Sequence, residues 1–370
     1  MFKFLIIPII ILILLSVYIV FNFHKFNIVK NLENKNRALS WFVASIPILI
    51  LIIIGLWYFM YSVVIIIHLS FLFFICRMIG ALIRKVIKFN TKCYIAGIMA
   101  IVLTTCYFAY GWQVAHKVVE TDYKVTSEKL SDDSLRIVQI TDSHMGTTFS
   151  GKEFEKYIDE ISECNPDVIV FTGDFVDGST TYEDMVDACE SLGKAKSKYG
   201  VYFIFGNHDL DVYGGNRYYS DEELLNELKK NNINVLQDEN VLIDDKFYIC
   251  GRQDATVRDR KSTEELLSEV DKSKFTLLLD HQPIEYKEAE ENGADMLLSG
   301  HTHGGQLFPL AYINTAISRN DMVYGFEQKG NTSFIVSSGI SEWGFGFRTG
   351  CKSEYVVIDV EGQREIAINN

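Results

Sequence analysis

The chain has 370 residues, enough for more than one folded unit, and its net charge of −13 is spread unevenly. Residues 1–120 carry a net charge of +9, which leaves −22 on residues 121–370. An acidic second half argues against nucleic acid as a partner, because phosphate backbones bind through Lys and Arg, and the seven scattered cysteines form no CxxC pair that would indicate a zinc knuckle.

The first half is dominated by apolar runs of the length that a transmembrane helix requires. A spanning helix needs about 20 mostly apolar residues. We predict four such spans, at about 4–23, 42–60, 62–83 and 93–112. No small-residue cleavage pattern precedes the first basic loop, which argues against a removable signal peptide. The sequence therefore predicts a membrane anchor of about four helices over residues 1–115.

Two basic loops predict how these spans are oriented. The first contains Lys25, Lys30, Lys35 and Arg37, and the loop before the last span contains Arg84, Lys85, Lys88 and Lys92. Basic loops tend to be cytoplasmic. Four spans place both loops on the same side, whereas a single long helix over 42–83 would place them on opposite sides. We therefore expect a multi-pass cell-membrane protein whose residues 113–370 are extracytoplasmic.

The second half, residues 116–370, alternates between strand and helix patterns. Helical periodicity is found at 151–163, 182–192, 220–230 and 263–270, and Ser220 with Glu223 forms a capping-box pattern at the third of these. Strand patterns are found at 116–130, 135–140, 168–171, 201–205, 235–243, 247–250, 275–279, 296–298, 333–336 and 355–358. This order predicts a layered α/β domain with a large sheet content.

Residue types that bind metals follow five of the predicted strands. They are Asp142 and His144, then Asp174, then Asn207, His208 and Asp209, then Asp280 and His281, and last His301 and His303. In an open α/β sheet the carboxyl ends of the strands meet at one crevice, so we expect these loops to meet. Residues two apart on extended backbone point the same way, so Asp142 and His144 can share one metal environment, as can His301 and His303. Mixed His, Asp and Asn ligation suits Mn, Fe or Zn.

Taken in order, these blocks resemble the calcineurin-like metallophosphoesterase family. They are Asp142-Ser-His144, Gly173-Asp174-Phe-Val-Asp177, Gly206-Asn207-His208-Asp209, His281 and Gly300-His301-Thr-His303. The ending Gly-Gly-Gln306 and the segment Phe347-Arg-Thr-Gly-Cys-Lys are similar to the membrane-associated bacterial branch of that family. The resemblance covers about residues 130–360 and implies a β-sandwich flanked by helices.

The resemblance also implies a centre with two divalent metal ions. Asp142, His144, Asp174 and His303 would bind the first ion, and Asp174, Asn207, His281 and His301 the second. Two cations about 3.5–4 Å apart can hold a phosphoryl group and lower the pKa of a water molecule. His208 would act as general acid or stabilise transition-state charge, with Asp209 orienting it. We interpret Asp177 as a loop-fixing residue, Asp280 as a strand end and Arg348 as a surface residue.

The functional prediction is a membrane-anchored hydrolase of phosphate esters, either a phosphodiesterase or a phosphatase. Proximity to the bilayer motivates a lipid-linked or cell-envelope substrate, and the family resemblance adds the pyrophosphate of a UDP-diacylglucosamine-like lipid. The alternative is a catalytically inactive membrane metallo-domain that acts as a sensor or scaffold. Loss of metal ligands would be the sign of that alternative, and all the expected ligands are present.

Overall fold

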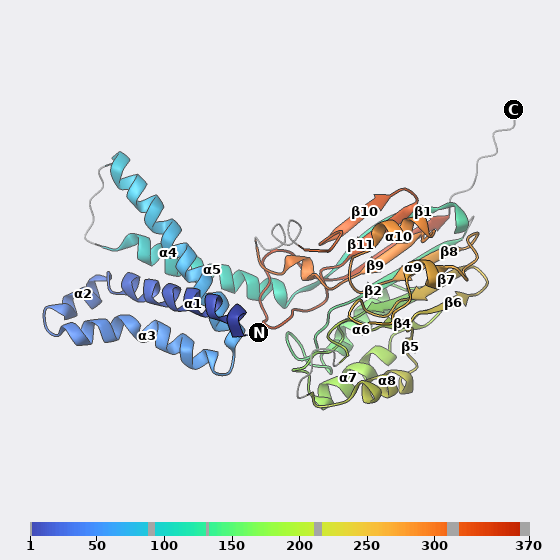
Figure 1. Cartoon of the computed structure of the whole chain (residues 1–370), viewed down its shortest axis with the longest axis horizontal. Coiled ribbons are helices and arrows are strands. Elements are labelled where there is room, and N and C mark those ends of the chain that lie inside the picture. The colour runs from blue at the N-terminus through green and yellow to red at the C-terminus, as the bar shows by residue number, and fades with distance from the viewer. Residues whose placement is uncertain (1, 88–92, 131–132, 211–216, 309–317, 363–370) are drawn as a thin grey trace. The chain divides into compact units, whose positions relative to one another are not determined.

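The computed structural model describes residues 2–87, 93–130, 133–210, 217–308 and 318–362 (Figure 1). The chain divides into two compact units, Met1–Tyr110 and Gly111–Asn370. The predicted boundary between residues 115 and 116 stays a prediction. Lys88 and Lys92, which contributed to the predicted basic loop before the last span, lie outside the described residues.

The first unit is helical, as its apolar runs predicted. Its helices are α1 (Phe2–Phe23), α2 (Asn27–Glu33), α3 (Arg37–Gly55), α4 (Phe59–Ile87) and α5 (Ile95–Ala115). By length and composition, α1, α3, α4 and α5 could each cross a membrane, which confirms the predicted four apolar helices. The two spans predicted within residues 42–83 are separate helices, since α3 ends at Gly55 and α4 begins at Phe59. One long helix over 42–83 is therefore excluded. The short helix α2 was not predicted.

The second unit contains two six-stranded sheets. The first has the strand order β1 (Val118–Ser127), β12 (Ser353–Gly362), β2 (Ser134–Ile140), β3 (Val168–Thr172), β4 (Val201–Ile204) and β5 (Asn234–Val235). The second has the order β10 (Gly325–Lys329), β11 (Thr332–Val336), β9 (Met296–Ser299), β8 (Phe275–Leu279), β7 (Phe247–Gly251) and β6 (Glu239–Ile243). Strands β2 to β5 are parallel in the first sheet, and β7, β8, β9 and β11 are parallel in the second.

Alternating side chains build the layers around these sheets. In β3, Val168 and Val170 join the core between the two sheets, whereas Ile169 and Phe171 join the core on the opposite face. That outer core includes residues of α6 (Phe154–Glu163), α7 (Tyr182–Gly193) and α8 (Asp221–Lys230). A third core packs α9 (Thr263–Leu267) and α10 (Tyr286–Glu291) on the second sheet. The predicted β-sandwich flanked by helices is therefore confirmed (Figure 1).

One predicted strand, at 235–243, is wrong. The structure divides it into β5 and β6, which belong to different sheets. Between them Asp238 has a φ of 59°, and its carboxylate accepts hydrogen bonds from the backbone N–H groups of Gln253 and Lys261, both at 2.9 Å. This anchored turn carries the chain from one sheet to the other. The short elements α10 and β10 were not predicted, whereas the capping box of Ser220 and Glu223 is confirmed.

Candidate metal centre

The loops that carry the predicted site residues come from both sheets rather than from the crevice of one open sheet. They follow β2, β3 and β4 in the first sheet, and β8 and β9 in the second. The structure brings six of the seven predicted ligands into two groups, Asp142 with His144 and His303, and Asp174 with His281 and His301. Within each group the potential ligand atoms lie within 4.8 Å of one another.

The backbone at these residues differs from the extended conformation that the spacing assumed. Five of the seven predicted ligands have a positive φ, namely Asp142 (53°), His144 (38°), Asp174 (53°), His301 (71°) and His303 (50°). Residues two apart therefore do not simply point the same way, and His301 and His303 lie in different groups. Each such conformation costs about 1–3 kcal/mol unless its surroundings hold it, and such residues concentrate at functional sites.

Two glycines let the carboxylates lie directly against the backbone. A Cβ atom at Gly300 would collide with the carboxylate of Asp142 and the hydroxyl of Thr141. A Cβ atom at Gly206 would collide with Asp174. Any larger residue at either position would displace a predicted ligand, so these glycines are part of the site's construction.

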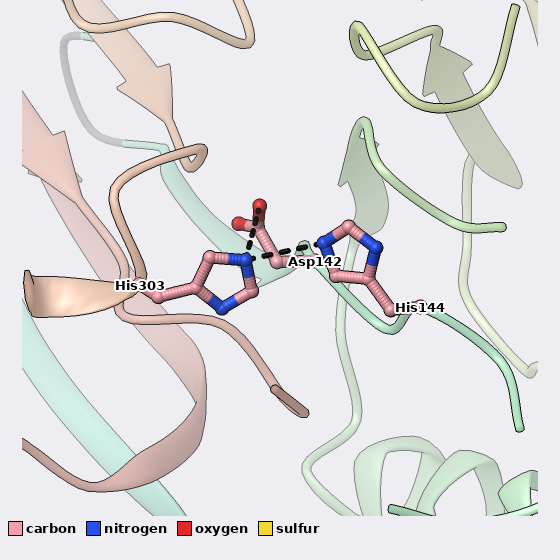
Figure 2. A group of neighbouring side chains, drawn as sticks. All are labelled: Asp142, His144 and His303. Atoms are coloured by element: carbon pink, nitrogen blue, oxygen red, sulfur yellow. Dashed lines mark hydrogen bonds and ion pairs between the residues drawn. The ribbon is translucent and has the colours of Figure 1, made fainter. Parts of the chain in front are cut away.

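The first group holds two imidazole nitrogens face to face (Figure 2). His144 Nε2 lies 3.1 Å from His303 Nε2, and Asp142 Oδ1 lies 3.7 Å from the same atom of His303. His303 Nδ1 donates to the carbonyl of Ser341 at 3.2 Å. His144 Nδ1 lies 3.3 Å from Asp177 Oδ2, an ion-pair separation whose geometry falls short of a hydrogen bond.

A proton on Nδ1 of each ring, where Asp177 and the carbonyl of Ser341 lie, leaves the two Nε2 lone pairs facing one another beside a carboxylate. Such an arrangement is repulsive by itself and favourable around a cation. Two nitrogens and a carboxylate oxygen are donors that suit Mn, Fe or Zn. The residues of the first group therefore fit a divalent metal ion.

In the second group, Asp174 reaches both sets of ligands. His281 Nδ1 donates to the carbonyl of Thr172 at 2.7 Å, which leaves its Nε2 lone pair free to bind a metal. That Nε2 atom lies 3.2 Å from Asn207 Oδ1 and 3.2 Å from Asp174 Oδ2. The same Asp174 oxygen lies 3.7 Å from His144 Nε2 in the first group. This position is the one that a bridging carboxylate requires.

Burial determines the protonation of several of these groups. It raises the pKa of Asp142 to about 6, because a buried carboxylate is disfavoured. Burial, assisted by the nearby His281, lowers the pKa of His301 to about 4. A His301 ring that stays neutral keeps a lone pair available for a metal ion.

Asp209 lies beneath the site rather than in its cavity. Its buried carboxylate accepts hydrogen bonds from the backbone N–H groups of Phe175 (2.8 Å), Val176 (3.0 Å) and Gly206 (2.8 Å). It therefore joins the loop after β3 to the loop after β4. Its predicted role in orienting His208 stays a prediction.

Asp177 has a role that the sequence interpretation missed. It does fix its loop, since Oδ1 accepts from the backbone and hydroxyl of Ser179 at 2.7 and 2.6 Å. Its other oxygen is the one that faces His144. Burial opposes the charge of Asp177, but the contact with His144 prevails and lowers its pKa to about 2. A carboxylate behind a metal-binding histidine fixes the ring and strengthens it as a ligand.

We expect Asp177→Asn to weaken binding of Mn²⁺ roughly 10- to 100-fold, the usual cost of losing such a supporting carboxylate. Isothermal titration of the full-length protein with Mn²⁺ measures this affinity. Ser179→Ala serves as the control, because it removes a hydroxyl contact of the same Asp177 without changing the carboxylate that faces His144. Equal Mn²⁺ affinity in Asp177→Asn and the wild type would contradict the supporting role.

Arg348 and Asp280 are buried, so the interpretation of Arg348 as a surface residue is wrong. Arg348 pairs with the buried Glu342 and donates to the carbonyls of Ser338 (2.7 Å), Ser341 (2.6 Å) and Lys352 (2.6 Å). The carbonyl of Ser341 also accepts from His303, so Arg348 fixes an atom that orients a predicted ligand. Asp280 is more than a strand end, because it pairs with Arg252 at 3.0 Å and Arg260 at 3.3 Å.

A cavity of about 480 Å³ opens at the two groups. Its lining residues are Asp174, Asn207, His208, His301, His303 and Trp343. Trp343 is 42% exposed, and the centroid of its ring lies 5.5 Å from that of His208. The side-chain amide of Gln306 donates to the carbonyls of Trp343 (3.3 Å), Phe345 (3.1 Å) and Phe347 (3.3 Å), which holds the tryptophan loop in place.

Comparison with known proteins agrees with this geometry. The family model of the calcineurin-like phosphoesterases matches residues 135–305. An uncharacterised metallophosphoesterase of Campylobacter jejuni is 31% identical over 237 residues, which cover 62% of this chain and 60% of that protein. A transmembrane protein with metallophosphoesterase domain from Danio rerio is 30% identical, with 70% of this chain and 61% of that protein covered.

The chain thus spans about 60% of the length of these two curated relatives. An uncharacterised metallophosphoesterase of Aquifex aeolicus is covered more completely. It is 30% identical over 249 residues, which make up 65% of this chain and 91% of that protein. Together with the family model, this match shows that the chain belongs to the calcineurin-like metallophosphoesterase family.

Proposed function

We propose that this chain is a metal-dependent phosphoesterase that hydrolyses phosphate esters at the candidate centre. The observation that carries the proposal is the pair of facing Nε2 atoms of His144 and His303, 3.1 Å apart beside Asp142. Asp142, His144, Asp174 and His303 would hold one divalent ion, and Asp174, Asn207, His281 and His301 the other. When bound, the two ions neutralise phosphoryl charge and lower the pKa of a water molecule.

The residues of the chain supply orientation and a donor for the leaving group. Asp177 and the carbonyls of Thr172 and Ser341 keep the ring protons on Nδ1, so each Nε2 faces the centre. Asn207 contributes a neutral oxygen, which limits the negative charge that a phosphate ester must approach. The ring of His208 lines the cavity and can donate a proton or a hydrogen bond to the leaving oxygen. Asp209 holds the loops from which Asp174 and His208 project.

The finer proposal is that the ester carries an apolar or planar group, as a lipid-linked phosphate or a UDP-diacylglucosamine-like lipid does. Trp343 supports it, because the exposed indole forms an apolar wall beside His208 and is held there by Gln306. The four apolar helices support association with the bilayer, where such substrates reside. Six of the seven predicted ligands form the two groups, and Asn207 lies 3.2 Å from His281, so no feature of the described residues favours an inactive sensor or scaffold.

The same proposal places the catalytic unit outside the cytoplasm. The connection from α1 to α3 carries Lys25, Lys30 and Lys35, and α4 ends with Arg84 and Lys85. Four spanning helices put both basic regions on one side, which we assign to the cytoplasm. Protection of residues 111–370 from protease added outside intact cells would contradict this orientation.

Hydrolysis of chromogenic esters by the full-length protein in detergent tests the function. We expect release of p-nitrophenol from bis(p-nitrophenyl) phosphate or p-nitrophenyl phosphate with Mn²⁺, loss of this activity with a chelator, and recovery when Mn²⁺ returns. Absence of turnover with Mn²⁺, Fe²⁺ or Zn²⁺ would refute the proposed function.

Trp343→Ala should raise KM for the aromatic diester, whereas Tyr182→Ala, which removes another exposed aromatic ring, should not.

A further inference from the structure

A charged residue, Arg77, lies inside the longest apolar helix. It belongs to α4, within the predicted span 62–83, and its side chain is exposed. Ionisable residues in membrane-spanning helices are costly and generally mark a site with a specific partner. At 1.5 Å per residue, Arg77 lies about 27 Å along the helix from Phe59, close to the roughly 30 Å thickness of the hydrocarbon layer. The guanidinium is therefore placed near the headgroups on the side of the basic loops.

Polar groups from three parts of the bundle meet at Arg77. Its Nη1 atom lies 3.5 Å from Oδ1 of the buried Asn22, at the end of α1. The hydroxyl of Tyr94, just before α5, donates to the same Asn22 oxygen at 2.6 Å. The Lys25 ammonium lies 5.9 Å from the centroid of the Tyr94 ring. Arg77 and the Tyr94 hydroxyl thus meet at one buried amide, and Lys25 lies beside the Tyr94 ring.

Among the described residues of the first unit, no carboxylate forms an ion pair with Lys25 or Arg77. Glu33 is the only acidic residue of the sequence between residues 1 and 110. It lies 3.8 Å from His24 and 3.9 Å from Arg37. Burial and the positive charge of Arg77 both lower the pKa of Lys25, which shows that the two cations repel one another. An anion between them would remove this repulsion.

An apolar cavity adjoins this cationic cluster. It has a volume of about 360 Å³ and lies between α4 and α5, with Gly80, Ile83, Met99 and Leu103 among its lining residues. Tyr94 belongs both to the cavity wall and to the cationic cluster, and Arg84 also lines the cavity. A ligand that fills both regions needs an anionic group attached to an apolar chain.

We propose that Lys25 and Arg77 bind the phosphate of an anionic phospholipid whose acyl chain passes Tyr94 and occupies the cavity between α4 and α5. The bilayer supplies such a ligand at the depth where Arg77 lies. The site is separate from the candidate metal centre, so it does not depend on the proposed hydrolysis. A soluble phosphate compound would satisfy the cations but leave the cavity without an occupant.

Native mass spectrometry of the full-length protein in detergent tests this site. We expect retention of dioleoyl phosphatidylglycerol over dioleoyl phosphatidylcholine by roughly 30-fold, because each of two basic residues near a membrane surface contributes a factor of about five. The double substitution Lys25→Gln with Arg77→Gln should abolish this preference. The matched control, Lys30→Gln with Lys35→Gln, removes the same number of charges from the connection that carries Lys25 and should keep the preference.

Three outcomes would overturn the site. The first is equal retention of the two lipids by the wild type, and the second is a loss of preference in the control pair as large as that in the tested pair. The third is competition by glycerophosphoglycerol, which has no acyl chains, that is as strong as competition by dioleoyl phosphatidylglycerol. Arg77→Lys keeps the charge and should keep most of the preference. Thermal unfolding of each variant in the same detergent separates loss of the site from loss of the fold.

Discussion

Asp174→Asn is expected to reduce hydrolysis of bis(p-nitrophenyl) phosphate by roughly 10³-fold or more. Asp174 Oδ2 is the oxygen that lies within reach of both His144 and His281, and an amide there cannot supply a negative charge to two cations. Losing one such metal site removes several kcal/mol of transition-state stabilisation, and each 1.36 kcal/mol corresponds to a factor of ten in rate. Steady-state rates with saturating Mn²⁺ give the activity, and elemental analysis gives the metal content.

The substitution is conservative for the fold. Asp174 Oδ1 accepts from the backbone N–H of His208 at 2.8 Å, and an asparagine oxygen can accept the same hydrogen bond. Asp259→Asn, at an exposed carboxylate, is the control and should retain both activity and metal. Full activity in Asp174→Asn with two bound ions would show that Asp174 does not bridge the centre.

Glu342→Ala is expected to be the most destabilising single substitution at the site. It leaves the fully buried guanidinium of Arg348 without its carboxylate, and breaking a buried ion pair in this way costs about 3–5 kcal/mol. For a unit of this size the melting temperature should fall by roughly 10 °C. Mn²⁺ affinity should also fall, because Arg348 holds the carbonyl of Ser341 that orients His303. Thermal unfolding and Mn²⁺ titration of the full-length protein provide the two measurements.

A double-mutant cycle measures the interaction free energy between Glu342 and Arg348 apart from their other contacts. Glu342→Leu combined with Arg348→Met removes both charges, so it should destabilise the protein by less than the sum of the two single substitutions. Glu342→Leu alone leaves the same unpaired guanidinium as Glu342→Ala. Strict additivity of the two single effects would contradict a direct energetic link between Glu342 and Arg348.

The sequence was sufficient to predict the architecture and the residues that gather at the centre. Apolar length identifies the helices long enough to span a membrane, and the strand patterns place Asp142, Asp174 and Asn207 at strand ends that the structure brings together. The chain's passage between sheets at Asp238 was missed, because a run of strand-forming residues continues on both sides of it. The spacing of His301 and His303 predicts one shared metal environment, whereas the family resemblance assigns them to different ions. The structure agrees with the resemblance, because left-handed backbone places the two side chains in different groups.

The sequence also does not predict which polar side chains are buried. Arg348 lies in a stretch with Gly, Thr and Lys that is typical of a surface loop. It is buried because Glu342 and three carbonyls, from Ser338, Ser341 and Lys352, surround it in the folded state. Asp177 was recognised as fixing a loop, but its contact with His144 depends on a turn of the backbone that no local pattern specifies.

The origin of the two ligand groups has a mechanical consequence for the sandwich. Asp142 and Asp174 extend from the first sheet, whereas His281, His301 and His303 extend from the second. Each bound ion would therefore cross-link the two sheets, adding to the apolar core between them and to hydrogen bonds such as that from Gln139 to the carbonyl of Ser299. Removal of the ions would then allow the two sheets to shift or separate at one end. The metal supply would therefore determine the stability of the whole unit as well as its chemistry.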